Sequence, residues 1–341
     1  MRVLVTGATG FVGRATILAL LEAGHGVRAF VRDTARVALS FGERPVDVLV
    51  GDVRDKAHVR EALKGVDALV HAAATYSYRR GDSGLMLREN PAIAEAVLGA
   101  AAAAGTSHVI DISSNVVFKA HADGPQAGRV DTGSPFWDAG DPQWLDPYLR
   151  SKVLAEWVSR GFAADGLPLS TIHPGLVIGP LDRGPGTSGI ALVALLGNPG
   201  LDPEGRGTWV DVRDVAAAIA AAVVRPPGGR YLVAADFLPF REMAGILDGI
   251  TGRRVRRLWL SAAWTRRAAS LNDLTGGLLV AALPPRGSLD FILTSAPIDG
   301  SSGEALLGRP YRAIEATIAD TLRWWAANGV IPRRWLGRLA A

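Results

Sequence analysis

The sequence predicts an α/β protein with a doubly wound parallel sheet and a smaller C-terminal α/β lobe. Short apolar segments alternate with segments of helical length through the first half of the chain. Such βαβ alternation implies a parallel sheet that helices cover on both faces. At 341 residues, with 48% hydrophobic and 21% charged residues, the chain is long enough for one large core and a second, smaller one.

The elements are expected in a regular order from the amino terminus. The buried strands are recognised as short apolar runs, at 2–6, 27–31, 46–50, 68–71, 108–112, 169–173 and 231–234. Helical periodicity and good helix formers such as alanine predict helices at 11–23, 34–39, 56–63, 91–104 and from 148 towards 162. Gly24 is the expected stop of the first helix. A further strand and helix fall within 209–224.

Composition excludes several kinds of site. The chain has no cysteine, so disulfides, thiol nucleophiles and thiolate metal sites are excluded, and the spacing of its six histidines predicts no metal site. The amino terminus carries no recognisable secretory signal, and the apolar run 276–283 is far shorter than the roughly 20 residues of a membrane helix. We therefore expect a cytoplasmic protein without a membrane span.

Net charge is mild, at +4. The basic cluster of Arg253, Arg254, Arg256 and Arg257, with Arg266 and Arg267 nearby, is interpreted as a solvated face, and no nucleic-acid partner is expected. Residues 119–147 are polar and rich in Gly, Pro and Asp, and they form a longer connection than most compact domains have. This segment is either a functional lid or a mobile insertion.

A glycine-rich loop follows the first strand. Gly7, Gly10 and Gly13 stand between a strand and a helix, where they permit a tight turn and close approach of the backbone to a pyrophosphate at the helix amino end. We therefore expect a dinucleotide-binding domain over 1–173, completed by about 207–235. Residues 174–206 and 236–341 would form the substrate-binding lobe and the terminal helix.

A second motif lies in the later helix. Tyr148 and Lys152 have the spacing Y-x-x-x-K, which places the phenol and the ammonium on one helix face. A tyrosine ordinarily titrates near pH 10, and a nearby positive charge favours its ionisation. The pair is therefore a candidate proton donor.

The two motifs, T-G-x-x-G-x-x-G and Y-x-x-x-K, resemble the extended branch of the short-chain dehydrogenase/reductase superfamily, the NAD-dependent epimerase/dehydratase family. The resemblance implies a Rossmann-type fold and covers nearly the whole chain. Residues 28–33 look most like dihydroflavonol-reductase and 3β-hydroxysteroid-dehydrogenase members.

In this family the cofactor lies along several segments. The resemblance implies cofactor contacts at Gly7, Thr9, Gly10, Phe11, Val12, Gly13, Asp52, Val53, Ala72, Ala73, Pro174, Gly175 and Val177, besides Tyr148 and Lys152. At the end of the second strand, Arg32 favours NADP because an arginine there binds the 2′-phosphate, whereas Asp33 would favour NAD. We expect NADP, with NAD as the alternative.

The family's catalytic pattern implies three residues. Ser114 would hydrogen-bond the substrate carbonyl, with Ser113 as the fallback, and Tyr148 would donate the proton. Lys152 would assist by its charge and reach the nicotinamide ribose. His173 replaces the family's frequent arginine and is interpreted as structural. Asp211 and Asp214 are candidate helix caps, and tryptophans 324 and 325 are expected to pack within a terminal helix.

These features predict an NADP-dependent oxidoreductase that reduces a ketone or aldehyde, or oxidises the matching alcohol. Trp259, Trp264 and the run 278–283 suit a hydrophobic or aromatic small molecule. A nucleotide-sugar epimerase is the alternative, although Leu176 stands where such enzymes often have asparagine. A cofactor-sensing regulator is the second alternative, and the Tyr-Lys pair counts against it. A homodimer is possible for this family.

Overall fold

The computed structural model describes residues 1–76, 83–138, 141, 146–184, 186–197, 201–274 and 292–340. Its main feature is a seven-stranded sheet in the order β10-β6-β5-β4-β1-β2-β3, in which every neighbouring pair is parallel. The strands are β1 (Arg2–Thr6), β2 (Gly26–Val31), β3 (Val46–Val50), β4 (Ala68–His71), β5 (Val109–Ile112), β6 (Leu169–Pro174) and β10 (Arg230–Val233). This confirms the predicted Rossmann-type sheet, whose strand order reverses between β1 and β4.

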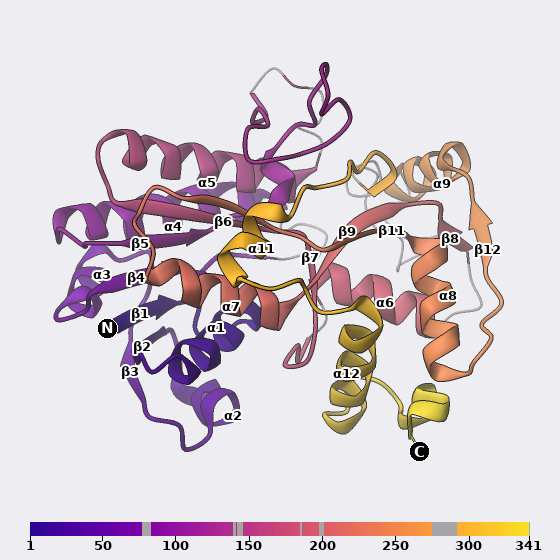
Figure 1. Cartoon of the computed structure of the whole chain (residues 1–341), viewed down its shortest axis with the longest axis horizontal. Helices are drawn as coiled ribbons and strands as arrows, with labels where there is room; N and C mark the ends of the chain where they lie inside the picture. The colour runs from indigo at the N-terminus through magenta and orange to yellow at the C-terminus, as the bar shows by residue number, and fades with distance from the viewer. Residues whose placement is uncertain are drawn as a thin grey trace.

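Helices cover both faces of this sheet (Figure 1). On one face Val3 and Val5 of β1 pack with α1 (Phe11–Glu22), α2 (Val37–Phe41), α7 (Val212–Val223) and α11 (Ser301–Leu307). On the other face Leu4 packs with α3 (Lys56–Leu63) and α4 (Ser83–Ala103), and α5 (Pro147–Ala164) lies against α4. The alternation of side chains along β1 thus builds two apolar layers.

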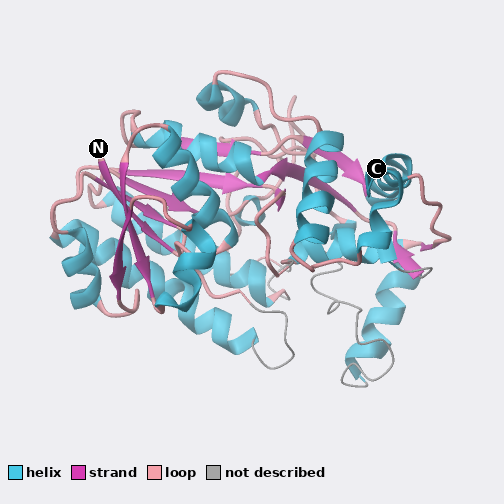
Figure 2. Ribbon diagram, turned by 90° about the horizontal axis from the view of Figure 1, so that it is seen from below, coloured by secondary structure: helices cyan, strands magenta, loops and turns pink. Residues whose placement is uncertain are grey.

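A second group of elements comes from segments of the chain on both sides of β10. It contains the sheet β11-β9-β7, with β7 (Leu176–Ile178), β9 (Arg206–Asp211) and β11 (Asp236–Pro239), and the pair β8 (Leu201–Pro203) and β12 (Leu258–Leu260). Its helices are α6 (Thr187–Gly197), α8 (Phe240–Thr251), α9 (Ala262–Leu274), α12 (Ile314–Ala327) and η3 (Arg333–Ala340). Figure 2 shows the large sheet on the side of the N-terminus and these elements on the side of the C-terminus.

Trp209 and Trp325 are fully buried in the core of this second group. Trp325 of α12 also donates from Nε1 to the carbonyl oxygen of Asp182 at 3.0 Å. The terminal helix therefore packs as expected. Asp211 caps α7 by accepting from the amide of Arg213, whereas Asp214 pairs with Arg309 and Arg312.

Several predicted elements have the bounds found in the structure, namely 2–6, 46–50, 56–63 and 68–71. The predicted helix 91–104 is wrong at its start, because α4 begins at Ser83 and contains Pro91 in its interior. Asn90, next to this proline, donates to the carbonyl oxygen of Thr75 at 3.1 Å and to Ser151 Oγ at 2.9 Å. These tertiary contacts stabilise the helical turns before Pro91, although a proline inside a helix is normally unfavourable.

The basic cluster is not uniformly solvated, which corrects the prediction. Arg257 is 6% exposed in its side chain, and it binds the carboxylate of Asp248 and the carbonyl oxygen of Leu195. Arg253 donates to the carbonyl oxygens of Leu196 and Trp335. Arg257 thus joins α6 to α8, and Arg253 joins α6 to η3, so both guanidinium groups hold helices of this group together.

The long polar segment after β5 is partly anchored. Isolated β-bridges join Phe118 to Phe136 and Val130 to Ile298, and Lys119 pairs with Asp141 at 2.7 Å. The 3-10 helix η1 (Thr34–Arg36) precedes α2, and η2 (Asn115–Val117) follows β5. The apolar run 276–283 lies outside the described residues. Among the helices that are described, none is long and apolar enough to cross a membrane.

Candidate active site

Gly7 and Gly13 of the glycine loop leave no room for a side chain. Gly7 has a φ of +65°, and a Cβ there would lie 2.6 Å from the carbonyl carbon of Ala72. A Cβ at Gly13 would lie 2.2 Å from the carbonyl oxygen of Gly7, while Gly10 is the N-cap of α1 and provides no side-chain cap. The first amide groups of α1 therefore remain available for an anion, as phosphate binding at a helix start requires. The loop fits the pyrophosphate of a dinucleotide.

Beside this loop lies a cleft of about 430 Å³. It runs past the carboxyl ends of β1 and β4, where open α/β sheets bind their ligands. Of the predicted site residues, those that line it are Gly7, Gly10, Phe11, Val12, Gly13, Ala72, Ser114, Tyr148, Gly175 and Val177. Segments distant in sequence thus meet around one space.

Two candidate catalytic groups line the cleft together. Ser114 is 7% exposed, and its Oγ accepts from the amide of Val116 at 3.4 Å. Tyr148 lies in the first turn of α5, which Asp146 caps by accepting from the amide of Leu149 at 2.7 Å. The fallback Ser113 instead donates to Glu156 Oε2 at 2.6 Å and lines a separate, small cavity. The geometry thus favours Ser114 over Ser113 as a cleft residue.

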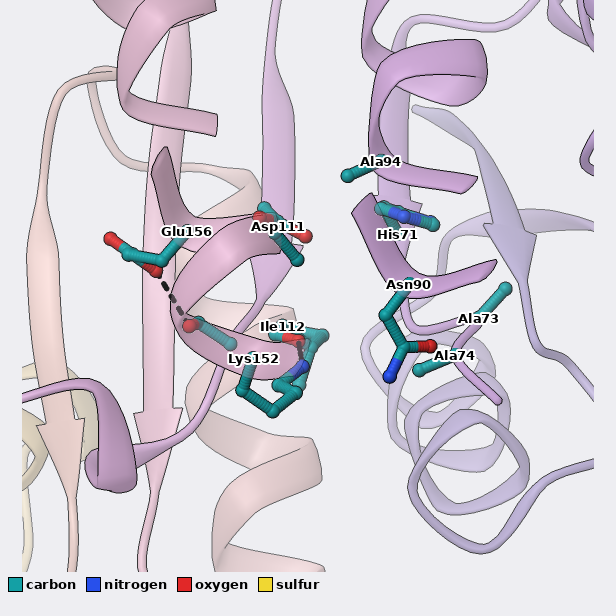
Figure 3. A pocket seen from close by; sticks show the side chains of 11 residues that line it. His71, Ala73, Ala74, Asn90, Ala94, Asp111, Ile112, Lys152 and Glu156 are labelled. Atoms are coloured by element: carbon teal, nitrogen blue, oxygen red, sulfur yellow. Dashed lines mark hydrogen bonds between the residues drawn. The ribbon is translucent and has the colours of Figure 1, made fainter. Parts of the chain in front are cut away.

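Lys152 lies one helical turn beyond Tyr148, and its side chain is directed towards the interior. Its ammonium donates to the carbonyl oxygen of Ile112 at 3.2 Å, and the residue lines the same small cavity as Ser113 (Figure 3). Burial lowers the pKa of Lys152, while the carboxylates of Asp111 and Glu156 act in the opposite direction. Its expected contact with a ribose remains a prediction.

The residues after β2 and β3 lie outside the lining of the cleft. Arg32 is exposed directly after β2, and the carboxylate of Asp33 accepts from the amide of Ala35 at 2.8 Å as the N-cap of η1. Asp52 pairs with Arg54, which lowers the pKa of Asp52 to about 2, with Arg32 contributing a smaller effect. Val53 is buried in the same apolar cluster as Phe30.

The other predicted residues are close to the cleft but do not line it. Thr9 is half-buried within the glycine loop, Ala73 lines the small cavity, and Pro174 ends β6 as a buried residue. His173 is fully buried, with Nε2 3.0 Å from Thr171 Oγ1. Burial lowers the pKa of His173 to about 3, so the ring is neutral at neutral pH. This arrangement suits a structural role.

Sequence reasoning missed part of the cleft. Tyr76, Asp146, Asp182, Ser188 and Ile292 line it without having been predicted. Tyr76 is 41% exposed, and its ring meets that of Tyr148. The signal for Tyr76 is its position five residues after the end of β4, at the edge where the strands end. The others come from separate connections and are assembled only by the fold.

The chain belongs to the NAD dependent epimerase/dehydratase family, whose model matches residues 3–234. It is therefore an enzyme of the extended short-chain dehydrogenase/reductase type, a class that binds NAD or NADP and includes oxidoreductases, dehydratases and epimerases. The family acts on small-molecule substrates.

Individual relatives match all or part of the chain. It is 30% identical over 338 residues to sterol demethylase protein B of Methylococcus capsulatus, and the match covers 97% of this chain and 100% of that protein. It is 30% identical over 201 residues to dihydroflavonol 4-reductase of Zea mays, covering 52% and 53%. The crystal structure of gox2253 matches with a TM-score of 0.81 and 27% identity, covering 96% of this chain and 98% of the other.

Proposed function

We propose that this protein is an NADP-dependent oxidoreductase that reduces a ketone or aldehyde on a hydrophobic or aromatic small molecule, or oxidises the matching alcohol. One observation carries the proposal: Ser114 and Tyr148 line the same cleft as the glycine loop. A hydroxyl, a phenol and a phosphate-binding loop around one space are the groups that carbonyl reduction needs.

Each residue has a distinct task in this proposal. The bound nicotinamide supplies the hydride. Ser114 donates a hydrogen bond to the substrate carbonyl oxygen and orients it, and Tyr148 gives that oxygen its proton, or takes the proton back in the direction of oxidation. Lys152 provides positive charge one helical turn away, which favours the ionised phenol that remains after proton transfer. The glycine loop would hold the pyrophosphate.

The substrate class is inferred from the wall of the cleft. Tyr76, Leu176 and Ile292 provide aromatic and aliphatic surface there, which suits an apolar molecule with one reactive carbonyl. The names of the relatives point in the same direction, since one is a dihydroflavonol 4-reductase and another a sterol demethylase protein. Trp264, in contrast, is 61% exposed on α9 and is not among the residues that line the cleft.

The preference for NADP is inferred from Arg32. It follows β2, where the adenosine ribose lies in this fold, and an exposed guanidinium can pair with a 2′-phosphate. The competing carboxylate of Asp33 is engaged in capping η1. One oxygen of this carboxylate therefore already accepts from the amide of Ala35.

A substrate panel tests the proposal. Purified protein is assayed with NADPH and with NADH against aromatic ketones, steroid-like ketones and aliphatic aldehydes, and calorimetry is run in parallel with nucleotide sugars. Turnover of apolar carbonyls with preference for NADPH is the expected result. Binding of nucleotide sugars without turnover of any apolar carbonyl would replace the proposal with the epimerase alternative.

A further inference from the structure

A small polar cavity lies next to the proposed site, on the side to which Lys152 is directed. Its volume is about 20 Å³, which is room for one water molecule. Polar and ionisable side chains from four elements line it: His71 of β4, Asn90 of α4, Asp111 of β5, and Lys152 and Glu156 of α5 (Figure 3). Of these, only Lys152 takes part in the proposed reaction, and Glu156 has no role in it so far.

Glu156 lies one helical turn beyond Lys152, on the same face of α5. It is 2% exposed. One carboxylate oxygen, Oε2, accepts from Ser113 Oγ at 2.6 Å, while Oε1 is buried without a hydrogen-bond partner among the described residues. A buried carboxylate oxygen is costly to leave unpaired. A water in the cavity or a proton on the carboxyl group would satisfy it.

Charged groups on β5, α5 and β10 act on Glu156. Asp111 is a source of like charge, and Lys152 and Arg230 are sources of opposite charge. Burial, the largest cause, raises the pKa of Glu156 to about 7, and burial lowers the pKa of Lys152. His71 and His173 nearby also have pKa values lowered by burial, so both rings are neutral at neutral pH.

We propose that Glu156 is a positioning residue for the reaction, whose carboxylate holds the Lys152 ammonium charged and in place across this one-water cavity. The charge that assists Tyr148 is then set by a buried pair and not by Lys152 alone. Without Glu156, only Asp111 would oppose the desolvation of the ammonium, and Lys152 would lose its proton at lower pH. The effect on Tyr148 rests on the proposed function, whereas the pairing itself does not.

The first test is the pH profile of alcohol oxidation, in which Tyr148 acts as base. Glu156→Gln preserves the size of the side chain and an acceptor for Ser113. We expect this variant to move the acid limb of kcat upward by about one pH unit, because Lys152 then loses its proton at lower pH and Tyr148 loses the positive charge that favours its ionised phenol. Glu156→Asp should return the limb towards its original position. Glu95→Gln is the matched control, since Glu95 is 54% exposed in its side chain and faces Lys56 on the surface.

The second test needs no turnover. Infrared spectra of the purified protein across pH should contain a protonated-carboxyl band that Glu156→Gln removes and that titrates above the usual range of glutamate. Lys152→Met should raise its midpoint further. A midpoint unchanged by Lys152→Met, or a band missing from both the wild type and Lys152→Met, overturns the pairing. An acid limb unmoved in Glu156→Gln of an active enzyme overturns the positioning role. If the protein reduces no carbonyl but the infrared band and its shift in Lys152→Met are observed, the pairing stands and only the proposed function is rejected.

Discussion

The ring of Tyr76 meets the ring of Tyr148 edge to face, with centroids 5.1 Å apart and planes at 84°. Tyr76 belongs to the connection after β4, and Tyr148 to the first turn of α5. The contact joins the proposed proton donor to the wall of the cleft. An aromatic pair of this geometry contributes about 0.5–1.5 kcal/mol beyond its buried area. Tyr76 thus packs against Tyr148, and in the proposed function it also provides apolar surface for the substrate.

Replacement of Tyr76 should therefore affect catalysis. In Tyr76→Ala we expect kcat/KM for an aromatic ketone to fall about tenfold, which corresponds to the loss of one such ring contact. Tyr76→Phe keeps the ring and should retain most of the wild-type value. Steady-state kinetics on both variants check this expectation. Equal kcat/KM values for the alanine and phenylalanine variants would show that the aromatic ring of Tyr76 does not contribute to catalysis.

The glycine loop makes a prediction about cofactor binding. Gly13→Ala should abolish binding of NADPH in calorimetry, because the new Cβ would lie 2.2 Å from the carbonyl oxygen of Gly7 and force the loop apart. Gly161→Ala is the matched control. Gly161 lies in α5, and a Cβ added there would have nothing within 4 Å, so alanine should raise stability by about 0.5–1 kcal/mol and leave binding unchanged. Normal binding by the Gly13 variant would contradict the phosphate assignment.

Cofactor preference depends on Arg32. The variant Arg32→Ala should lose affinity for NADPH about tenfold or more while its affinity for NADH changes little, because only NADPH carries the 2′-phosphate. Arg36→Ala, which removes another exposed guanidinium four residues away, should leave both affinities unchanged. Fluorescence titration measures the affinity of each variant for NADPH and for NADH. A parallel loss for NADH and NADPH would remove the argument for NADP.

The buried ring of His173 predicts how stability depends on pH. Its folded pKa, about 3, lies below the ordinary value of 6.5, so the unfolded chain binds a proton that the folded chain does not between these values. Stability should therefore fall as pH drops below about 6.5, by about 2 kcal/mol at pH 5 from this residue alone. Urea unfolding at pH 7 and pH 5 measures the loss. The variant His173→Gln should be less stable at pH 7 but show a smaller loss of stability between the two pH values. A loss equal to that of the wild type would mean that other groups cause the pH dependence.

The sequence was most informative where local signals decide the structure. Strand β1, helix α3 and the glycine loop depend on apolar periodicity and on glycine geometry, both of which are visible in neighbouring residues. The start of α4 was mispredicted because Pro91 is normally a first-turn residue, and the bonds from Asn90 to Thr75 and Ser151 that support the earlier turns join distant segments.

In the candidate site too, local sequence patterns predicted some residues, and only the fold brings the others together. Tyr148 and Lys152 were predicted from their spacing, and Glu156 continues that spacing by one more turn of the same helix. Its significance was not visible in the sequence, because the cavity that it shares with Lys152 is closed by β4, β5 and α4. The direction of the Lys152 side chain towards Ile112 likewise depends on β5, 40 residues earlier in the chain.

The variant Tyr148→Phe tests the central claim most directly. Phenylalanine keeps the ring that packs against Tyr76 and removes only the phenolic hydroxyl. On the best carbonyl substrate of the panel, kcat for NADPH oxidation should fall by about 100- to 10,000-fold, the usual contribution of a general acid, while calorimetry should give an NADPH affinity close to that of the wild type. Turnover at the wild-type rate in this variant would contradict the assignment of Tyr148 as the proton donor.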